Sequence, residues 1–88
     1  MERQKKEKIE FDYELLRLRI RARYKSESNF AKAIGVNKSY LSRKLHNQIE
    51  ITSYEVVTWS RLLDIPESLI GSFFFTPKST NGKDKANA

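Results

Sequence analysis

Apolar residues recur three or four positions apart along most of this chain, which is the spacing of one face of a helix. No stretch alternates apolar and polar residues over the length of a strand with turn residues at both ends. A helix of this kind is stable when another element covers its apolar face. Because 88 residues suffice for one such core and not for two, we predict a single domain of the all-α class.

Capping residues divide the first half of the chain into three predicted helices. The first runs from the N-cap Asp12 to about Arg23, and Leu16, Ile20 and Tyr24 form its apolar stripe. The second begins near Ser26 and ends at Gly35, a residue type that readily takes the left-handed conformation found after helices. The third follows the N-cap Asn37, spans residues 38–46 and directs Leu41 and Leu45 inward. Ser39 and Arg43 then point away from the core.

Two further helices are predicted in the second half. The sequence Thr52-Ser53-Tyr54-Glu55 is typical of a capping box and begins the fourth helix, with Val56, Trp59 and Leu63 on its apolar face. Pro66 suits the first turn of a fifth helix, which we expect to end at Gly71. The sequence therefore predicts a compact five-helix domain over residues 11–76.

The net charge of +6 is distributed unevenly along the chain. Residues 11–25 carry +3 and residues 36–50 carry +2, whereas residues 51–76 carry −2. The charge indicates an anionic partner, and its distribution places a basic surface on the first half of the domain. We predict that residues 1–10 form a flexible charged arm and residues 77–88 a disordered basic tail, because the tail has no large apolar residue.

Several classes of function lack the residues they need. The chain has no cysteine and a single histidine, His46, so we expect no metal centre and no cofactor. No Ser/His/Asp or Cys/His set and no phosphate-binding glycine loop is present, and we expect no enzyme activity. The charged N-terminus and the short apolar runs predict a cytoplasmic protein without a membrane segment.

One run of residues resembles a known DNA-binding motif. The run is Phe30-Ala31-x-x-Ile34-Gly35-Val36-Asn37-x-x-x-Leu41-Ser42-Arg43, and it is similar to the helix-turn-helix of the Cro and lambda-repressor type. Residues 12–70 match the five-helix plan of that family. The resemblance implies that the second and third helices form a helix-turn-helix whose third helix enters the major groove of DNA.

The resemblance also implies roles for individual residues. The candidates for contact with bases are Lys38, Ser39, Ser42 and Arg43. Arg43 is the strongest of them, because a guanidinium can donate two hydrogen bonds to guanine. The candidates for contact with phosphates are Ser28, Asn29, Tyr40, Lys44 and Asn47. The alternative for each of these side chains is a solvated polar residue without a ligand.

The sequence departs from that family at several positions. Many relatives have glutamine where this chain has Glu27, whose charge would repel a phosphate, so Ser28 or Asn29 is expected to take over that contact. Ile20 and Leu45 stand where many relatives have an ion pair. Two readings of the arginines of the first helix remain open, a solvated surface and a set of phosphate contacts. These arginines are Arg17, Arg19, Arg21 and Arg23.

These observations predict a transcriptional regulator of double-stranded DNA, either a phage or prophage repressor or a Cro-like switch, without a small-molecule effector. Such regulators usually bind as homodimers. The expected dimer surface is the C-terminal end, formed by Leu69, Ile70, Phe73, Phe74 and Phe75. One or two of the phenylalanines could instead fold back against Trp59. The alternative function is an antitoxin or antirepressor that binds a protein through this phenylalanine-rich end.

Overall fold

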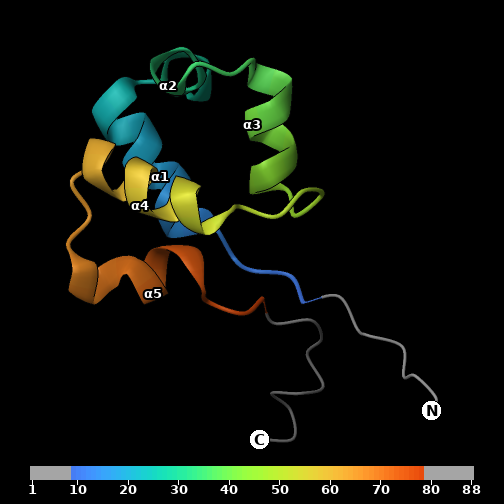
Figure 1. Ribbon diagram of the computed structural model, residues 1–88, viewed down its shortest axis with the longest axis vertical. Helices are drawn as coiled ribbons and strands as arrows, with labels where there is room; N and C mark the ends of the chain where they lie inside the picture. The colour runs from blue at the N-terminus through green and yellow to red at the C-terminus, as the bar shows by residue number, and fades with distance from the viewer. Residues whose placement is uncertain (1–8, 79–88) are drawn as a thin grey trace, which may run out of the picture.

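The computed structural model describes residues 9–78, and these residues form the predicted all-α fold. Its elements are α1 (Glu14–Tyr24), α2 (Glu27–Ile34), α3 (Lys38–Leu45), α4 (Ser53–Leu62), the 3-10 helix η1 (Glu67–Leu69) and α5 (Ile70–Phe74). Figure 1 shows α2 and α3 at one end of the molecule and α5 at the other, with α1 and α4 between them. No strand occurs in this part of the chain, apart from one isolated bridge.

Three of the predicted helix starts are confirmed by their capping hydrogen bonds. The Ser26 hydroxyl accepts from the Asn29 amide, and the Asn37 side chain accepts from the Tyr40 amide at 2.8 Å. Both halves of the capping box between Thr52 and Glu55 are present. Each cap satisfies a backbone donor that the helix itself leaves free.

The first and last helices differ from their predicted bounds. The first begins at Glu14, so its N-cap is Tyr13 and the prediction of Asp12 at that position is wrong by one residue. The Asp12 carboxylate still accepts a hydrogen bond from the Glu14 amide at 2.9 Å. The prediction of the last helix is wrong at both ends, because residues Glu67–Leu69 form the 3-10 helix η1, and α5 begins at Ile70 and continues to Phe74. A glycine inside a helix costs about 1 kcal/mol relative to alanine, and burying the Phe73 and Phe74 side chains outweighs that cost.

Aromatic rings occupy the centre of the core. The Trp59 ring lies 5.5 Å from the Phe30 ring in an edge-on arrangement and 6.5 Å from the Phe74 ring. Around them are aliphatic side chains from α1, α3 and the end of α4, and all of these are fully buried: Leu16, Ile20, Leu41 and Leu63. The core thus joins all five helices, as the apolar stripes predicted.

The C-terminal phenylalanines divide between the core and the surface. Phe73 and Phe74 are buried, so their assignment to a dimer surface is wrong, and the alternative of folding back against Trp59 holds for Phe74. The physical reason is that the extended α5 turns both rings inward. Phe75 is 50% exposed, Leu69 is exposed and Ile70 is half-buried, so these three remain available at the surface.

The two ends of the described chain lie side by side. Phe11 and Pro77 form an isolated antiparallel bridge, and the Lys78 amide donates to the Glu10 carbonyl at 2.9 Å. The ordered domain therefore extends slightly beyond the predicted range 11–76. The rest of the predicted arm and tail, residues 1–8 and 79–88, lies outside the described residues. Within residues 9–78, no helix has the length and apolarity needed to cross a membrane.

Candidate nucleic-acid interface

A three-residue turn fixes the direction of α3 relative to α2. Gly35 ends α2 with a φ of 79°, a left-handed value that most residues with a side chain adopt only with strain. The Val36 amide donates to the Ala31 carbonyl at 3.0 Å, and Asn37 then caps α3. Because so few residues connect the two helices, α2 and α3 form one unit with a defined angle between them.

The outer face of α3 presents polar groups that have no partner within the domain. Lys38, Ser39 and Arg43 are exposed. Ser39 and Arg43 lie on the side of the helix away from the buried Leu41 and Leu45, and Lys38 lies at the N-terminal end of the helix. Among residues 9–78, none of these three outward side chains takes part in a hydrogen bond or an ion pair. Their donors are therefore free to bind a ligand.

Ser42 lies at the edge of this face, where it is half-buried and close to His46. The Nδ1 atom of His46 lies 2.8 Å from the Ser42 carbonyl oxygen and 3.3 Å from the Ser42 hydroxyl. A carbonyl oxygen only accepts, so this nitrogen carries the proton. His46 thus closes the C-terminal end of α3, and the hydroxyl proton of Ser42 stays free to donate.

The other polar candidates, Ser28 and Asn29, lie in the first turn of α2. Ser28 is half-buried, and its hydroxyl makes no hydrogen bond within the described part of the chain. The side-chain amide of Asn29 donates to the Tyr24 carbonyl at 2.8 Å, which leaves one of its two amide protons free. Both residues keep a donor that a phosphate could accept.

The negative charge of Glu27, expected to repel a phosphate, has a counter-ion in the structure. The Arg17 Nε atom lies 3.1 Å from the Glu27 carboxylate, which joins α1 to the start of α2. The pair brings a guanidinium to the N-terminal end of α2. Neutralisation of Glu27 by Arg17 was not predicted from the sequence, because the two residues are ten positions apart and belong to different helices.

The prediction that Lys44 contacts a phosphate is wrong, because Lys44 is only 2% exposed. Its ammonium donates to the Glu55 carboxylate and to the Glu50 carbonyl, both at 2.8 Å. It also lies 4.7 Å from the centre of the Tyr40 ring. An ammonium with these partners is held inside the domain and has no access to a DNA strand.

Glu55 is the centre of a polar group around the buried Lys44, which we call the Lys44 cluster: Tyr40, Lys44, Thr52, Glu55 and the Glu50 carbonyl. One Glu55 oxygen accepts from Lys44 and from the Thr52 amide, and the other accepts from the Tyr40 hydroxyl at 3.1 Å. Since the Tyr40 proton is used here, the predicted role of Tyr40 in phosphate binding is also wrong. The cluster links α3 directly to the start of α4.

The hydrogen bonds of the cluster decide the protonation of its charged groups. Burial alone would raise the pKa of Glu55, but the hydrogen bonds from Lys44, the Thr52 amide and Tyr40 together lower that pKa below its ordinary value. Burial alone would lower the pKa of Lys44, and the bonds to Glu55 and Tyr40 instead raise it. Both groups are therefore charged at neutral pH.

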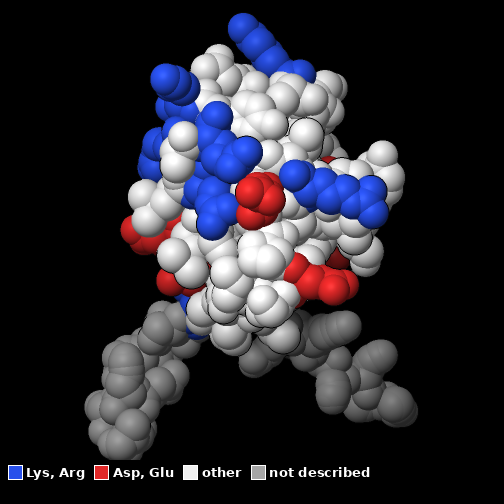
Figure 2. All heavy atoms as spheres, turned by 90° about the vertical axis from the view of Figure 1, so that its left-hand side faces the viewer, with Lys and Arg blue, Asp and Glu red and all other residues white. Residues whose placement is uncertain are grey.

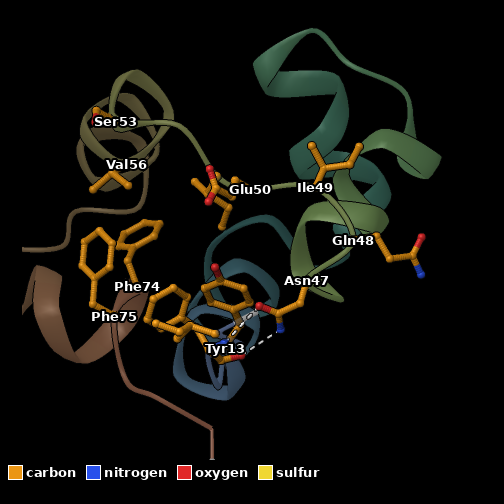
Figure 3. A pocket seen from close by; sticks show the side chains of 12 residues that line it. Tyr13, Asn47, Gln48, Ile49, Glu50, Ser53, Val56, Phe74 and Phe75 are labelled. Atoms are coloured by element: carbon orange, nitrogen blue, oxygen red, sulfur yellow. Dashed lines mark hydrogen bonds between the residues drawn. The ribbon is translucent and has the colours of Figure 1, made fainter. Parts of the chain in front are cut away.

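Asn47 has a structural role that replaces its predicted phosphate contact. Its φ is 64°, a left-handed value that asparagine adopts more readily than most residues do. The side chain accepts a hydrogen bond from the Phe11 amide at 3.0 Å and donates one to the Phe11 carbonyl at 2.9 Å, drawn as dashed lines in Figure 3. Asn47 thereby ties the segment before α1 to the end of α3.

Two arginines of α1 bind the far end of α4. The Arg19 guanidinium donates to the carbonyls of Leu63 and Asp64 at 2.8 and 3.0 Å and lies over the Phe73 ring. Arg23 lies 3.8 Å from the Asp64 carboxylate. Figure 2 shows basic side chains gathered on this side of the molecule, with acidic ones among and below them. For Arg19 and Arg23 the structure thus identifies internal partners.

An apolar hollow of about 640 Å³ lies between the loop after α3, the start of α4 and the end of α5. Figure 3 shows Val56, Phe74 and Phe75 on one side and Ile49 and Gln48 on the other, with Glu50 between them. The hollow brings Phe75, an exposed ring from the predicted dimer surface, next to the loop that follows α3. Within the described range, no group of three or more His, Cys, Asp or Glu side chains is placed to hold a metal ion.

Comparison with known proteins identifies a family without a known activity. No curated protein matches the chain. The family described as "Protein of unknown function (DUF739)" matches residues 9–77, which is nearly all of the described domain. The chain therefore belongs to the DUF739 family.

Proposed function

We propose that the protein is a transcriptional regulator that binds double-stranded DNA in a sequence-specific manner, as a phage or prophage repressor or a Cro-like switch. In this proposal α2 and α3 act as a helix-turn-helix of the Cro and lambda-repressor type. The observation that carries the proposal is the outer face of α3, where Lys38, Ser39 and Arg43 are exposed without partners among the described residues. Arg43 and Lys38 supply the donors that guanine edges and phosphates accept.

The surrounding geometry supports this function in two ways. The turn at Gly35 gives α3 a defined angle to α2, and groups that read DNA bases must be held rigidly. The Ser28 hydroxyl and the Arg17 guanidinium lie at the N-terminal end of α2, where positive dipole ends and donors favour an anion. Together they form a second contact region for the phosphate backbone.

A selection experiment tests the proposal. The purified protein is mixed with a library of random-sequence duplexes, and the retained duplexes are sequenced over several rounds. We expect enrichment of one motif, and weaker retention of that motif by Arg43→Ala than by the control Arg61→Ala, whose arginine is exposed on α4. A library that stays random after repeated rounds would contradict sequence-specific binding.

The proposed partner on the protein side is a second copy of the chain. One α3 helix reads a few base pairs, and a two-fold dimer doubles the contacts on an inverted repeat with half-sites about one helical turn apart. The remaining surface candidates are Leu69, Ile70 and Phe75. Sedimentation of Phe75→Glu beside the parent tests the dimer, because a dimeric parent and a monomeric variant are expected. A monomeric parent would contradict it.

A second candidate function is an antitoxin or antirepressor that binds another protein through the same end of the molecule. The apolar hollow beside Phe75 favours this alternative, since an apolar recess next to an exposed ring suits a protein partner. The selection experiment separates the two proposals when it is combined with Phe75→Glu. If Arg43→Ala loses DNA binding and Phe75→Glu does not, the result supports the transcriptional regulator. If the parent protein enriches no duplex sequence, the result favours the antitoxin or antirepressor.

A further inference from the structure

The Lys44 cluster is more elaborate than the stability of α3 requires. Leu41 and Leu45 already attach α3 to the core through buried apolar side chains. Burying an ammonium is unfavourable unless hydrogen bonds and an opposite charge replace the water that it loses. An apolar residue of similar size would avoid this desolvation cost. The presence of a buried lysine on α3 therefore calls for a role other than attachment.

Directional hydrogen bonds can supply what apolar contacts cannot. Apolar burial is non-directional, so it allows a short helix to rotate or slide by small amounts at little cost. The two residues of α3 in the cluster, Tyr40 and Lys44, lie one helical turn apart, and both donate to the same carboxylate. Two fixed points one turn apart define both the rotation of a helix and its position along its axis.

The carboxylate that receives these bonds is itself fixed. Glu55 lies in the first turn of α4, and its side chain is held there by the capping box with Thr52. The Lys44 ammonium also donates to the Glu50 carbonyl, in the loop that joins the two helices. The position of α3 is thereby defined relative to α4 and to the connecting loop together.

We propose that Glu55 is a positioning residue for sequence readout: through Tyr40 and Lys44 it fixes the rotation and axial position of α3, and so places Lys38 and Arg43 against particular bases. This inference rests on the proposed DNA-binding function. Groups that read a ligand must be held within about 0.5 Å and 10–20° of their binding geometry. Glu55 meets that need without touching DNA, and it makes specificity depend on a residue of α4.

The test uses the double variant Lys44→Met, Glu55→Gln. It removes one positive and one negative charge, so the net charge and the long-range attraction to DNA are unchanged. Glutamine can keep the capping bond to Thr52, but its side-chain nitrogen cannot accept the hydrogen bond from Tyr40, and methionine at position 44 donates none. Because both charges of the pair are removed together, neither is left unpaired, and the variant is expected to fold.

The first measurement compares the affinity of parent and variant for the duplex selected above and for a shuffled duplex. We expect the ratio of the two affinities to fall by about tenfold or more in the variant, with the affinity for shuffled DNA unchanged. The control is Arg61→Met, Glu67→Gln, which removes one charge of each sign from exposed positions on α4 and η1. The control is expected to keep the ratio of the parent. An unchanged ratio in the Lys44 and Glu55 variant would overturn the proposal.

The second measurement needs no DNA and keeps the inference separate from the proposed function. Residual dipolar couplings of the backbone amides report the orientation of α3 relative to α1, α2 and α4 in parent and variant. We expect the couplings of α3 to change or to average in the variant, while those of the other helices stay fixed. Unchanged α3 couplings would overturn the positioning role. A parent that binds no DNA, with altered α3 couplings in the variant, would instead overturn the proposed function and retain the positioning of α3 by Glu55.

Discussion

The two sides of α3 carry the same kind of charge and use it differently. Lys38 and Arg43 are exposed, with no partner among the described residues, whereas Lys44 is buried with Glu55, the Glu50 carbonyl and the Tyr40 ring around it. Three cations within seven positions of one helix thus serve two purposes. The comparison teaches that a basic helix is not a uniform binding surface, because the partners that neighbouring elements bring to each cation decide whether its charge faces a ligand or the domain itself.

The largest expected effect is on the inner side of α3. Glu55→Ala leaves the Lys44 ammonium buried without its counter-ion and removes the capping bond to Thr52, so we expect a loss of about 3–5 kcal/mol in the free energy of unfolding. Urea unfolding followed by Trp59 fluorescence measures this loss. Glu67→Ala is the control, because that carboxylate is exposed, and it should change stability by less than about 0.5 kcal/mol. A similar loss of unfolding free energy in Glu55→Ala and Glu67→Ala would contradict the contrast between the inner and outer sides of α3.

On the outer side the expected loss is in binding rather than in folding. Arg43→Ala should weaken binding to the selected duplex by about 1–3 kcal/mol while the free energy of unfolding stays within about 0.5 kcal/mol of the parent. Fluorescence anisotropy with the selected and shuffled duplexes gives the first quantity. Equal losses on both duplexes would mean that Arg43 contacts the backbone and reads no base.

A smaller effect is expected for the cation at the start of α3. Lys38→Met should lower the affinity for DNA, and if Lys38 neutralises a phosphate the slope of log K against log salt becomes less steep by about 0.9. Anisotropy titrations at several salt concentrations measure that slope. An unchanged slope together with a loss confined to the selected duplex would instead assign Lys38 to base readout.

The smallest effect is the pH dependence of stability. The pKa of Glu55 is lowered in the folded protein, so its contribution to stability is complete above the pKa of the unfolded chain, near 4.5, and is lost as the pH falls through the lower folded value. We expect the free energy of unfolding of the parent to fall more steeply in this acidic window than that of the Lys44→Met, Glu55→Gln variant. Parallel pH profiles would show that Glu55 is not held by charged partners.

Most of the fold was predictable because local signals agreed with one another. The caps Ser26, Asn37 and Thr52 and the turn at Gly35 all occur as predicted from the sequence. The wrong end of the last helix has a physical cause: a glycine predicts a helix end at Gly71, but the burial of Phe73 and Phe74 favours a helix that continues past it to Phe74. The helix propensity of the local sequence predicts that a last helix exists, whereas tertiary packing determines where this helix ends.

The candidate site was less predictable, because it depends on contacts between distant residues. The phosphate contact of Lys44 is implied by the family resemblance alone, although Lys44 directly precedes Leu45 and shares a helix side with Tyr40. The capping residue Glu55 was recognised, but its second role as partner of Lys44 required the position of α4 relative to α3. A lysine beside an apolar stripe, with an acidic cap downstream, is a signal that could have raised this possibility from the sequence.

One competition titration tests the central claim most directly. The protein is bound to the selected duplex at near-physiological salt and at a higher salt concentration, and shuffled duplex is added as competitor. The account predicts that the selected duplex is preferred by about 10³-fold or more and that both affinities fall with salt. Equal affinity for the two duplexes at both salt concentrations would contradict sequence-specific reading of DNA by α3.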